Sequence, residues 1–320
     1  MSVGRGRLAR GGLACFILAA ALMPAQGDAT LKIAVVLSRD VAPYREAVRG
    51  FEDVLKQSRH SYKLHEFSSD GVAAARGTLG EKIRAREPDL ILTVGSAATQ
   101  LISEEIRDLP IVFSMVLPSS GSRSLEELRE ARPNVTGASM EIPVRTQFVK
   151  LKEVLPTAKR IGVLYNPDVS GPIIEEAAEI ARDLGLELVP LAVTCEKDVL
   201  AAISSLARNV DVLWSVADST VFSEQGLRQI LLETLRNRTP FVGLSPSFVK
   251  AGALLAFSTD YRDLGRQAGE QSLRILVGED VSRIPMTDPR QLLLSINMNT
   301  AKQIQVHIRD EIRMNANVFF

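Results

Sequence analysis

The sequence predicts an α/β protein with two similar lobes, each a parallel β-sheet flanked by helices. Two observations predict this class. Short apolar runs alternate with amphipathic stretches along the chain, and the pattern of the first half recurs in the second. With 320 residues, 46% of them hydrophobic and 24% charged, the chain is long enough for two domains that each bury a core. This composition excludes a disordered chain, a disulfide scaffold and a collagenous repeat.

Residues 1–27 have the pattern of a secretory signal peptide. Arg5, Arg7 and Arg10 precede an apolar run over residues 13–23, which is too short to span a bilayer, and a small-x-small site ends at Gly27. We expect cleavage there, export to the periplasm and a mature protein that does not span the membrane. An uncleaved anchor would also place the protein outside the cytoplasm.

The two cysteines predict neither a lipid anchor nor a disulfide. Cys15 lies early in the apolar run, whereas a lipidated cysteine follows its run, so we expect no lipidation. Cleavage would leave Cys195 alone, which excludes an intrachain disulfide. The whole chain has 38 basic and 38 acidic side chains, whereas nucleic-acid binders normally carry a basic excess. We therefore expect no nucleic-acid partner.

Seven short runs rich in Val, Ile and Leu are expected to be strands. They cover residues 31–37, 89–94, 110–116, 160–165, 186–192, 210–216 and 240–244. Such near-continuous apolar runs are typical of parallel strands that are covered on both faces. After Pro43, the apolar residues Tyr44, Val48, Phe51 and Leu55 recur at helical spacing, which predicts an amphipathic helix between the first two runs.

A weak internal duplication relates the two halves. Residues 32–41 (KIAVVLSRDV) match residues 160–169 (RIGVLYNPDV), and residues 89–98 (DLILTVGSAA) match residues 211–220 (DVLWSVADST). Convergence of two parallel-sheet halves could also produce this match. Either origin predicts two similar lobes, with the break near residues 137–145.

The turns after these strands are where a ligand is expected. In open parallel sheets, ligands lie beyond the carboxyl ends of the strands, where helix N-termini direct free N–H groups outward. The turns at residues 38–44, 95–96, 165–166 and 218–220 are rich in small, hydroxylic and acidic residues. Ser96 and free helix amides suit a carboxylate, and Asp218 suits an ammonium group. Both are also preferred N-cap types, and the two roles can coexist.

Six segments in order carry a resemblance to a known family. They are residues 89–118 (DLILTVGSAATQLISEEIRDLPIVFSMVLP), 134–137 (NVTG), 155–156 (LP) with 160–167 (RIGVLYNP), 251–253 (AGA), 260–267 (DYRDLGRQ) and 299–302 (NTAK). Together they resemble the ABC-transporter substrate-binding family with the type I periplasmic-binding-protein fold, some of whose members bind tryptophan or tyrosine. The resemblance implies two Rossmann-like lobes joined by a three-strand hinge. It implies an N-terminal lobe of residues 31–138 plus about 263–284, and a C-terminal lobe of residues 139–262 plus about 291–320.

The resemblance also implies the two walls of the cleft. Residues 95–96 match the family's Gly-Ser/Thr turn, and residues 218–220 match its Asp-Asn-Thr segment, with Asp218 expected to bind an ammonium group. The full set of candidate ligand-binding residues is Ser38, Tyr44, Gly95, Ser96, Tyr165, Asn166, Asp218, Ser219, Thr220, Ser245 and Asp260.

The chain departs from the aromatic-amino-acid binders at three places. Ser38-Arg39-Asp40 replaces a His-Pro-type turn, Leu117 replaces Asp, and Ser219 replaces Asn. The aromatic class of ligand is therefore not fixed by the resemblance. Five aromatic side chains near strand ends could form a stacking wall or belong to the core: Tyr44, Tyr165, Phe222, Phe248 and Tyr261.

Catalytic motifs are not found, so we expect a binding protein rather than an enzyme, with no cofactor, metal site or catalytic residue. His60, His65 and His307 have no evident nucleophile beside them, Cys195 has no CxxC partner, and residues 243–247 (GLSPS) depart from G-x-S-x-G. The expected function is capture of an amino acid or a related small polar solute for the membrane permease of an ABC transporter, by a monomer. A periplasmic sensor that reports to a membrane receptor or kinase is the alternative, and an enzyme is third. The tail, residues 309–320, fits both packing on a lobe and fraying.

Overall fold

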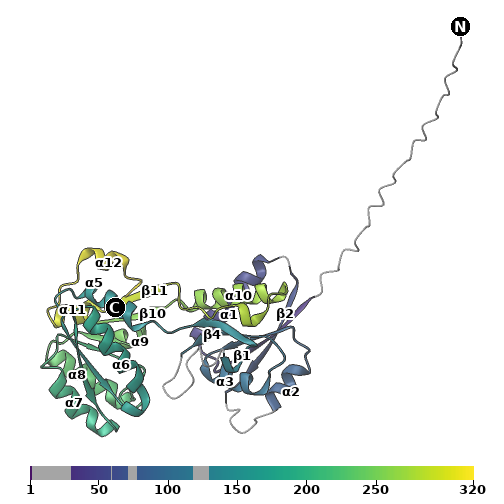
Figure 1. Ribbon diagram of the computed structural model, residues 1–320. Coiled ribbons are helices and arrows are strands. Elements are labelled where there is room, and N and C mark those ends of the chain that lie inside the picture. The colour runs from purple at the N-terminus through teal and green to yellow at the C-terminus, as the bar shows by residue number, and fades with distance from the viewer. Residues whose placement is uncertain (2–29, 59, 71–77, 118–129) are drawn as a thin grey trace.

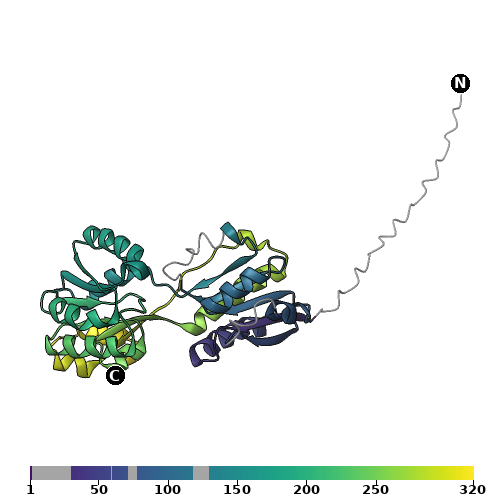
Figure 2. The same cartoon turned by 90° about the horizontal axis from the view of Figure 1, so that it is seen from below.

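Two separate β-sheets divide the chain into an N lobe and a C lobe (Figures 1 and 2). The computed structural model describes residues 1, 30–58, 60–70, 78–117 and 130–320. Residues 2–27 of the expected signal peptide, including Cys15, lie outside the described residues. The two-lobed α/β class predicted from the sequence is confirmed.

The N lobe contains a five-stranded parallel sheet in the order β2-β1-β3-β4-β5. Its strands are β1 (Leu31–Leu37), β2 (Tyr62–Ser68), β3 (Leu90–Val94), β4 (Ile111–Val116) and β5 (Val135–Ser139). The helices are α1 (Ala42–Gln57), α2 (Thr78–Arg84), α3 (Ser96–Glu105) and, from late in the chain, α10 (Tyr261–Leu276). β3 and β4 are buried along their whole length, as expected for strands that are covered on both faces.

The C lobe contains a seven-stranded sheet in the order β12-β11-β10-β9-β8-β6-β7. Its strands are β6 (Arg160–Tyr165), β7 (Glu187–Ala192), β8 (Val212–Trp214), β9 (Phe241–Gly243), β10 (Leu255–Thr259), β11 (Leu292–Ile296) and β12 (Val318–Phe319). Only β10 and β11, among the described pairs, are antiparallel. The helices are α5 (Val144–Val154), α6 (Pro167–Asp183), α7 (Val199–Leu206), α8 (Glu224–Arg236), α9 (Pro246–Ala251), α11 (Met298–Gln303) and α12 (Asp310–Asn315).

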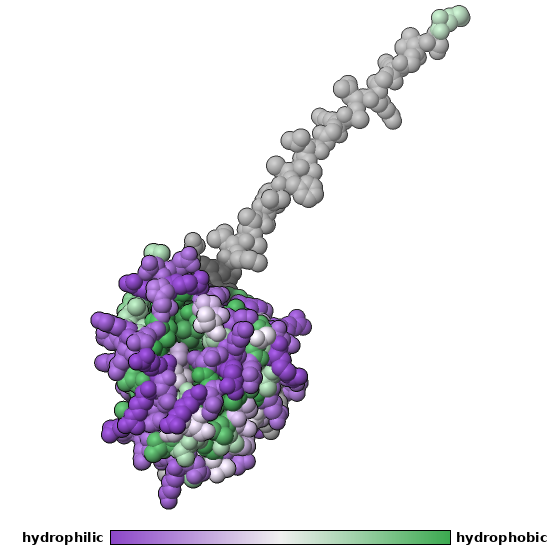
Figure 3. Space-filling model, turned by 90° about the vertical axis from the view of Figure 1, so that its left-hand side faces the viewer, coloured by the Kyte–Doolittle hydropathy of each residue, from purple (hydrophilic) through white to green (hydrophobic). Residues whose placement is uncertain are grey.

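All seven strands predicted from apolar runs are present, and so is the helix that carries the Tyr44 to Leu55 stripe. The tail, for which the sequence left two possibilities, packs on the C lobe, because β12 pairs with β11. Hydrophilic side chains with apolar ones between them cover the end of the C lobe that faces away from the N lobe (Figure 3). No helix in the described ranges is long and apolar enough to cross a membrane.

The internal duplication reappears as the same contact in both lobes. In the N lobe, the carboxylate of Asp89 accepts a hydrogen bond of 2.8 Å from the backbone N–H of Lys32. In the C lobe, Asp211 accepts a hydrogen bond of 2.8 Å from the backbone N–H of Arg160. Each aspartate thus joins the amino ends of the two neighbouring strands in its own sheet.

The chain passes between the lobes three times. The first crossover, residues 140–143, connects β5 to α5; the second is at Asp260, between β10 and α10; the third, residues 288–291, leads into β11. The N-lobe side of the third crossover is held by Thr136, whose Oγ1 donates to the Ile284 carbonyl at 2.9 Å. Arg290 is held there too, because its Nη2 donates to the buried Asp263 carboxylate at 3.0 Å.

Helix α10 packs against α1 at a very short backbone distance (Figure 1). A Cβ added to Gly265 would lie 1.8 Å from the Ala47 carbonyl oxygen, and one added to Gly50 would lie 1.8 Å from the Arg262 carbonyl oxygen. Only glycine allows this approach. The contact fixes on the N lobe the helix that directly follows the second crossover.

Candidate functional site

A cavity of about 210 Å³ lies where the crossovers meet the carboxyl ends of the C-lobe strands. Its wall consists of residues 140–142, 214–217, 243–244, 257–259, Leu117, Gln147, Ile173 and Tyr261. The first crossover, the strands β8, β9 and β10 and the first residue of α10 therefore all contribute. Leu117, which follows β4, brings the N lobe to the same cavity.

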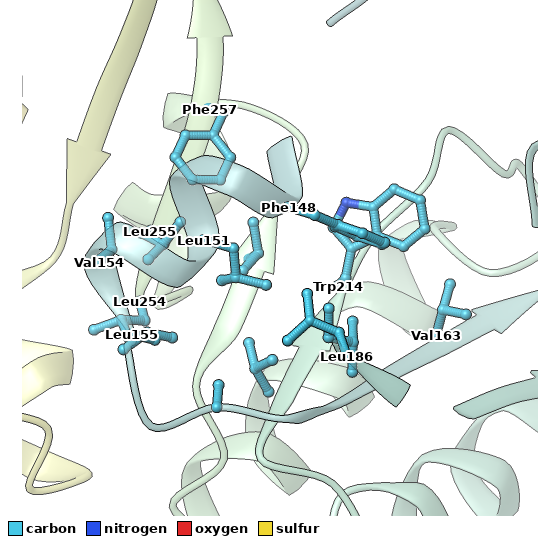
Figure 4. Close-up of a cluster of buried hydrophobic side chains, with 14 of the residues drawn as sticks. Phe148, Leu151, Val154, Leu155, Val163, Leu186, Trp214, Leu254, Leu255 and Phe257 are labelled. Carbon is cyan, nitrogen blue, oxygen red and sulfur yellow. The ribbon is translucent and has the colours of Figure 1, made fainter. Parts of the chain in front are cut away.

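Aromatic side chains form one wall of this cavity. The indole N–H of Trp214 donates to Gln147 Oε1 at 2.8 Å, and Gln147 Nε2 donates to the Ile142 carbonyl at 2.7 Å. The rings of Trp214 and Phe148 meet edge to face, with centroids 5.0 Å apart, and Phe257 belongs to the same cluster (Figure 4). Gln147 thus ties the orientation of the indole to the first crossover.

Glu141 is the single charged residue among the described residues that line the cavity. It lies on the first crossover and is half-buried. Burial raises the pKa of its carboxyl above the ordinary value of 4.5, and the nearby carboxylates of Glu176 and Asp288 raise this pKa further. Sequence reasoning missed Glu141. The available signal was an acidic residue inside the segment expected to join the lobes.

The N-lobe candidates come together at the carboxyl edge of their sheet. Ser38 Oγ accepts from the backbone N–H of Ala98 at 2.9 Å, in the first turn of α3. A Cβ on Gly95 would lie 2.6 Å from Ser38 Oγ and 2.7 Å from Tyr44 Oη, so these three residues are neighbours. Ser96 Oγ both donates to the Leu117 carbonyl and accepts from the Leu117 N–H, each at 3.1 Å. Through Leu117 this group reaches the edge of the cavity.

Replacing Gly95 with Ala is expected to destabilise the N lobe by about 1–3 kcal/mol. Gly95 has a φ of 91°, where a side chain is strained, and the added methyl would displace Ser38 and Tyr44. Urea unfolding of the two proteins measures the difference. Equal midpoints and slopes would show that this turn tolerates a side chain.

The C-lobe candidates are joined by the carboxylate of Asp218, which is buried. Its Oδ2 accepts from the Asn166 N–H at 2.7 Å and from Ser170 Oγ at 2.6 Å. Its Oδ1 accepts from the Thr220 N–H at 2.9 Å and from the Val221 N–H at 3.3 Å. Four donors correspond to the full acceptor capacity of a carboxylate. Asp218 thus connects the turn after β6 to the turn after β8. From the sequence, Asp218 was expected either to bind backbone groups locally or to contact the ligand, and these bonds are of the first kind.

The remaining candidates are spread along the same edge. Asn166 caps α6 and donates from Nδ2 to Thr220 Oγ1 at 2.9 Å. Asp260 caps α10 by accepting from the N–H groups of Arg262 and Asp263. Ser219 is exposed, and Ser245 occupies the N-cap position of α9 without a side-chain cap.

None of the eleven candidates lines the cavity, although several of its lining residues are their direct neighbours in the chain: Ala217, Leu244, Thr259 and Tyr261. The ligand-binding roles of the eleven therefore stay predictions. Of the aromatic residues that the sequence singled out, Tyr261 lines the cavity. Phe222 and Phe248 pack with Phe241 in a core cluster, which agrees with the core alternative.

Within the described parts of the chain, no group of three or more His, Cys, Asp and Glu side chains is arranged to hold a metal ion. Cys195 is exposed, and its thiol donates to the Asp198 carboxylate at 3.1 Å. What the site offers chemically is therefore an apolar, partly aromatic cavity with one carboxylate at its wall.

The chain is similar to known proteins over most of its length. A family model described as ABC transporter substrate binding protein matches residues 31–319. A tyrosine-binding protein of Clostridioides difficile is 27% identical over 261 residues, which are 81% of this chain and 75% of that protein.

Solved structures show the same fold. The ligand-free, open structure of a Clostridium difficile substrate binding protein with adhesive properties has a TM-score of 0.75 at 22% identity, covering 90% of this chain and 99% of the other. A Streptococcus pneumoniae domain in complex with L-Trp has a TM-score of 0.67 at 21% identity, covering 91% and 100%. At 21% and 22% sequence identity, these two structures show that the fold is shared.

Proposed function

We propose, because the chain belongs to the ABC transporter substrate-binding protein family, that it captures a small solute in the cavity between its lobes and delivers it to a membrane permease. One observation carries this proposal: the cavity lies at the crossovers and receives residues from both lobes. The family match does not favour the sensory alternative.

Lobe closure is the step that this arrangement supports. A ligand in the cavity can contact the C-lobe strand ends and the first crossover at once, and Leu117 and Ser96 lie on the facing lobe. Only a closed state makes both sets of contacts. A solute that binds this state better shifts a hinge equilibrium of a few kcal/mol towards it.

An amino acid is the ligand class that we propose. The relatives described as binding tyrosine and L-Trp support it, as does an apolar wall that contains Trp214 and Phe257. The first turn of α3, beside Ser96, offers N–H groups of the kind that bind a carboxylate. The departures at Ser38, Leu117 and Ser219 leave the choice between aromatic and aliphatic side chains to measurement.

The cellular setting that we propose follows from the N-terminal pattern and the family. Residues 1–27 would direct export and be removed, so the mature protein would work in the periplasm, as a monomer and without catalysis. The permease would receive the closed, loaded form.

A thermal-shift screen tests this function. The mature chain, unfolded and refolded to remove carried-over ligand, is screened against amino acids, small peptides, nucleobases, sugars and organic acids. A ligand at a hundredfold excess over its Kd adds about 2.7 kcal/mol to the free energy of unfolding, so a clear shift is expected with at least one amino acid. The absence of a shift with every compound would contradict the proposal.

A further inference from the structure

We propose that Glu141 binds the protonated amine of the solute, and that the substrate class is therefore a small amine with an apolar body, such as an α-amino acid. This inference rests on the proposed function and deepens it. It assigns the ammonium contact to the first crossover instead of to the turn after β8.

The described residues that line the cavity leave the charge of Glu141 uncompensated. The lining residues around Glu141 are aliphatic, aromatic, hydroxylic or amide, and the described wall brings no cation to it. Glu141 is also held in place, because its backbone N–H donates to Ser139 Oγ at 3.0 Å, and that hydroxyl donates to the Val116 carbonyl at 3.3 Å. The carboxylate therefore belongs to a segment anchored at the end of β4.

The charged groups near Glu141 make a cation favourable beside its carboxylate. Among the described residues, the charged groups that act on it are two acids, Glu176 on α6 and Asp288 on the third crossover. A half-buried carboxylate that faces two other acids is less stable than one in water unless a cation compensates it. A protonated amine entering the cavity supplies this compensation, whereas a sugar or an organic acid does not.

A second and independent group in the same wall lacks a partner. Thr259 is 3% exposed and lines the cavity. Its Oγ1 is buried and has no hydrogen-bond partner within the described structure. Buried hydroxyls normally have one, so Thr259 is an unsatisfied polar group within the wall to which Glu141 belongs.

Asp218 presents the opposite case. Its carboxylate already accepts four hydrogen bonds from its own lobe, so an ammonium group would have to displace one of them. Glu141 needs no such exchange. Because Asp218 is already saturated with hydrogen bonds and Glu141 is not, substitution of Glu141 tests which acid binds the amine.

The experiment is calorimetric titration of the wild-type mature chain and of Glu141→Gln with matched probes. The probes are the L-amino acids that shift the wild type most, and for each of them the carboxylic acid that lacks the amine and the amine that lacks the carboxylate. We expect the wild type to bind the amino acid at least tenfold more tightly than its deaminated acid. Glu141→Gln should lose at least tenfold in affinity for the amino acid and lose most of that preference.

Two control variants show whether the effect belongs to this carboxylate. Glu179→Gln removes an exposed acid of α6 that does not line the cavity, and its affinities should equal those of the wild type. Glu141→Asp keeps the charge and should retain part of the preference for the amine.

The outcomes separate this inference from the proposed function. Wild-type binding of amino acids that Glu141→Gln leaves unchanged would overturn the role of Glu141 and leave solute binding standing. Equal binding of an amino acid and its deaminated acid, or tight binding of sugars alone, would overturn the substrate class. No binding of any of these probes, together with no shift for any compound of the thermal-shift screen, would overturn both proposals.

The pH dependence of binding is a further expected result. A protonated Glu141 cannot compensate an ammonium group, so affinity for the amino acid should fall as the pH drops through the raised pKa of this residue, which lies above 4.5. The carboxylates of Glu176 and Asp288 act on the same group, and Tyr261, in the same wall, stays neutral because burial raises its pKa. In Glu141→Gln, the slope of the logarithm of the affinity against pH should be smaller by one proton than in the wild type. Equal slopes in both proteins would contradict the assignment.

Discussion

Replacing Asp218 with Ala is expected to lower the free energy of unfolding by about 3–5 kcal/mol. The substitution removes one carboxylate and leaves three backbone N–H groups without an acceptor, in the turns after β6 and β8. Ser170 Oγ keeps only its longer contact of 3.4 Å to the Asn166 carbonyl. Because Asp218 is 3% exposed, water can replace the lost oxygens only after the turns separate. The cost therefore comes from unpaired N–H groups more than from the loss of a charge.

Urea unfolding of Asp218→Ala measures this loss, and Asp211→Ala is the matched control. Asp211 also accepts two backbone hydrogen bonds, from Lys159 and Arg160, but it is exposed, so water can take its place at a cost of about 1 kcal/mol or less. If Asp218→Ala keeps its stability and instead loses amino-acid affinity, Asp218 binds the ammonium, as the sequence led us to expect.

Replacing Gly265 with Ala is expected to destabilise the N lobe by about 3 kcal/mol. The new Cβ would lie 1.8 Å from the Ala47 carbonyl oxygen, so α10 and α1 must move apart along their whole contact. The second crossover leads directly into α10. The displacement should therefore also alter how easily the lobes move relative to each other.

Thermal unfolding of Gly265→Ala tests this, with Gly171→Ala as the control. Gly171 lies in α6 with no atom within 4 Å of a built Cβ, so alanine there should be neutral or stabilising by a few tenths of a kcal/mol. Similar unfolding temperatures for both variants would show that the two helices are not packed as closely as described.

Much of the fold could be predicted because the signal lies in local apolar patterns. The buried strands β1, β3 and β4 are continuous apolar runs, and their positions follow from composition alone. β2 was harder, because its exposed and half-buried residues alternate without a clear apolar face. The packing of the tail depends on the pairing of β12 with β11, a long-range contact that no local pattern specifies.

The candidate site could be predicted only in part, for a physical reason. Residues at the carboxyl ends of strands can be identified from sequence, and Ser38, Tyr44 and Gly95 do come together. Whether such a side chain faces a ligand or caps a helix depends on backbone direction at the turn. Asp218 and Asp260 both turn to backbone N–H groups. Glu141 lies on a crossover without a motif, so only the three-dimensional structure reveals that it lines the cavity.

Small-angle X-ray scattering of the mature chain, with and without the best amino acid from the screen, measures whether the lobes close on the solute. We expect a smaller radius of gyration in the presence of ligand, because the two lobes close on a cavity to which both contribute. Glu141→Gln at the same ligand concentration should keep the larger radius. Saturating binding with an unchanged radius would contradict capture by lobe closure.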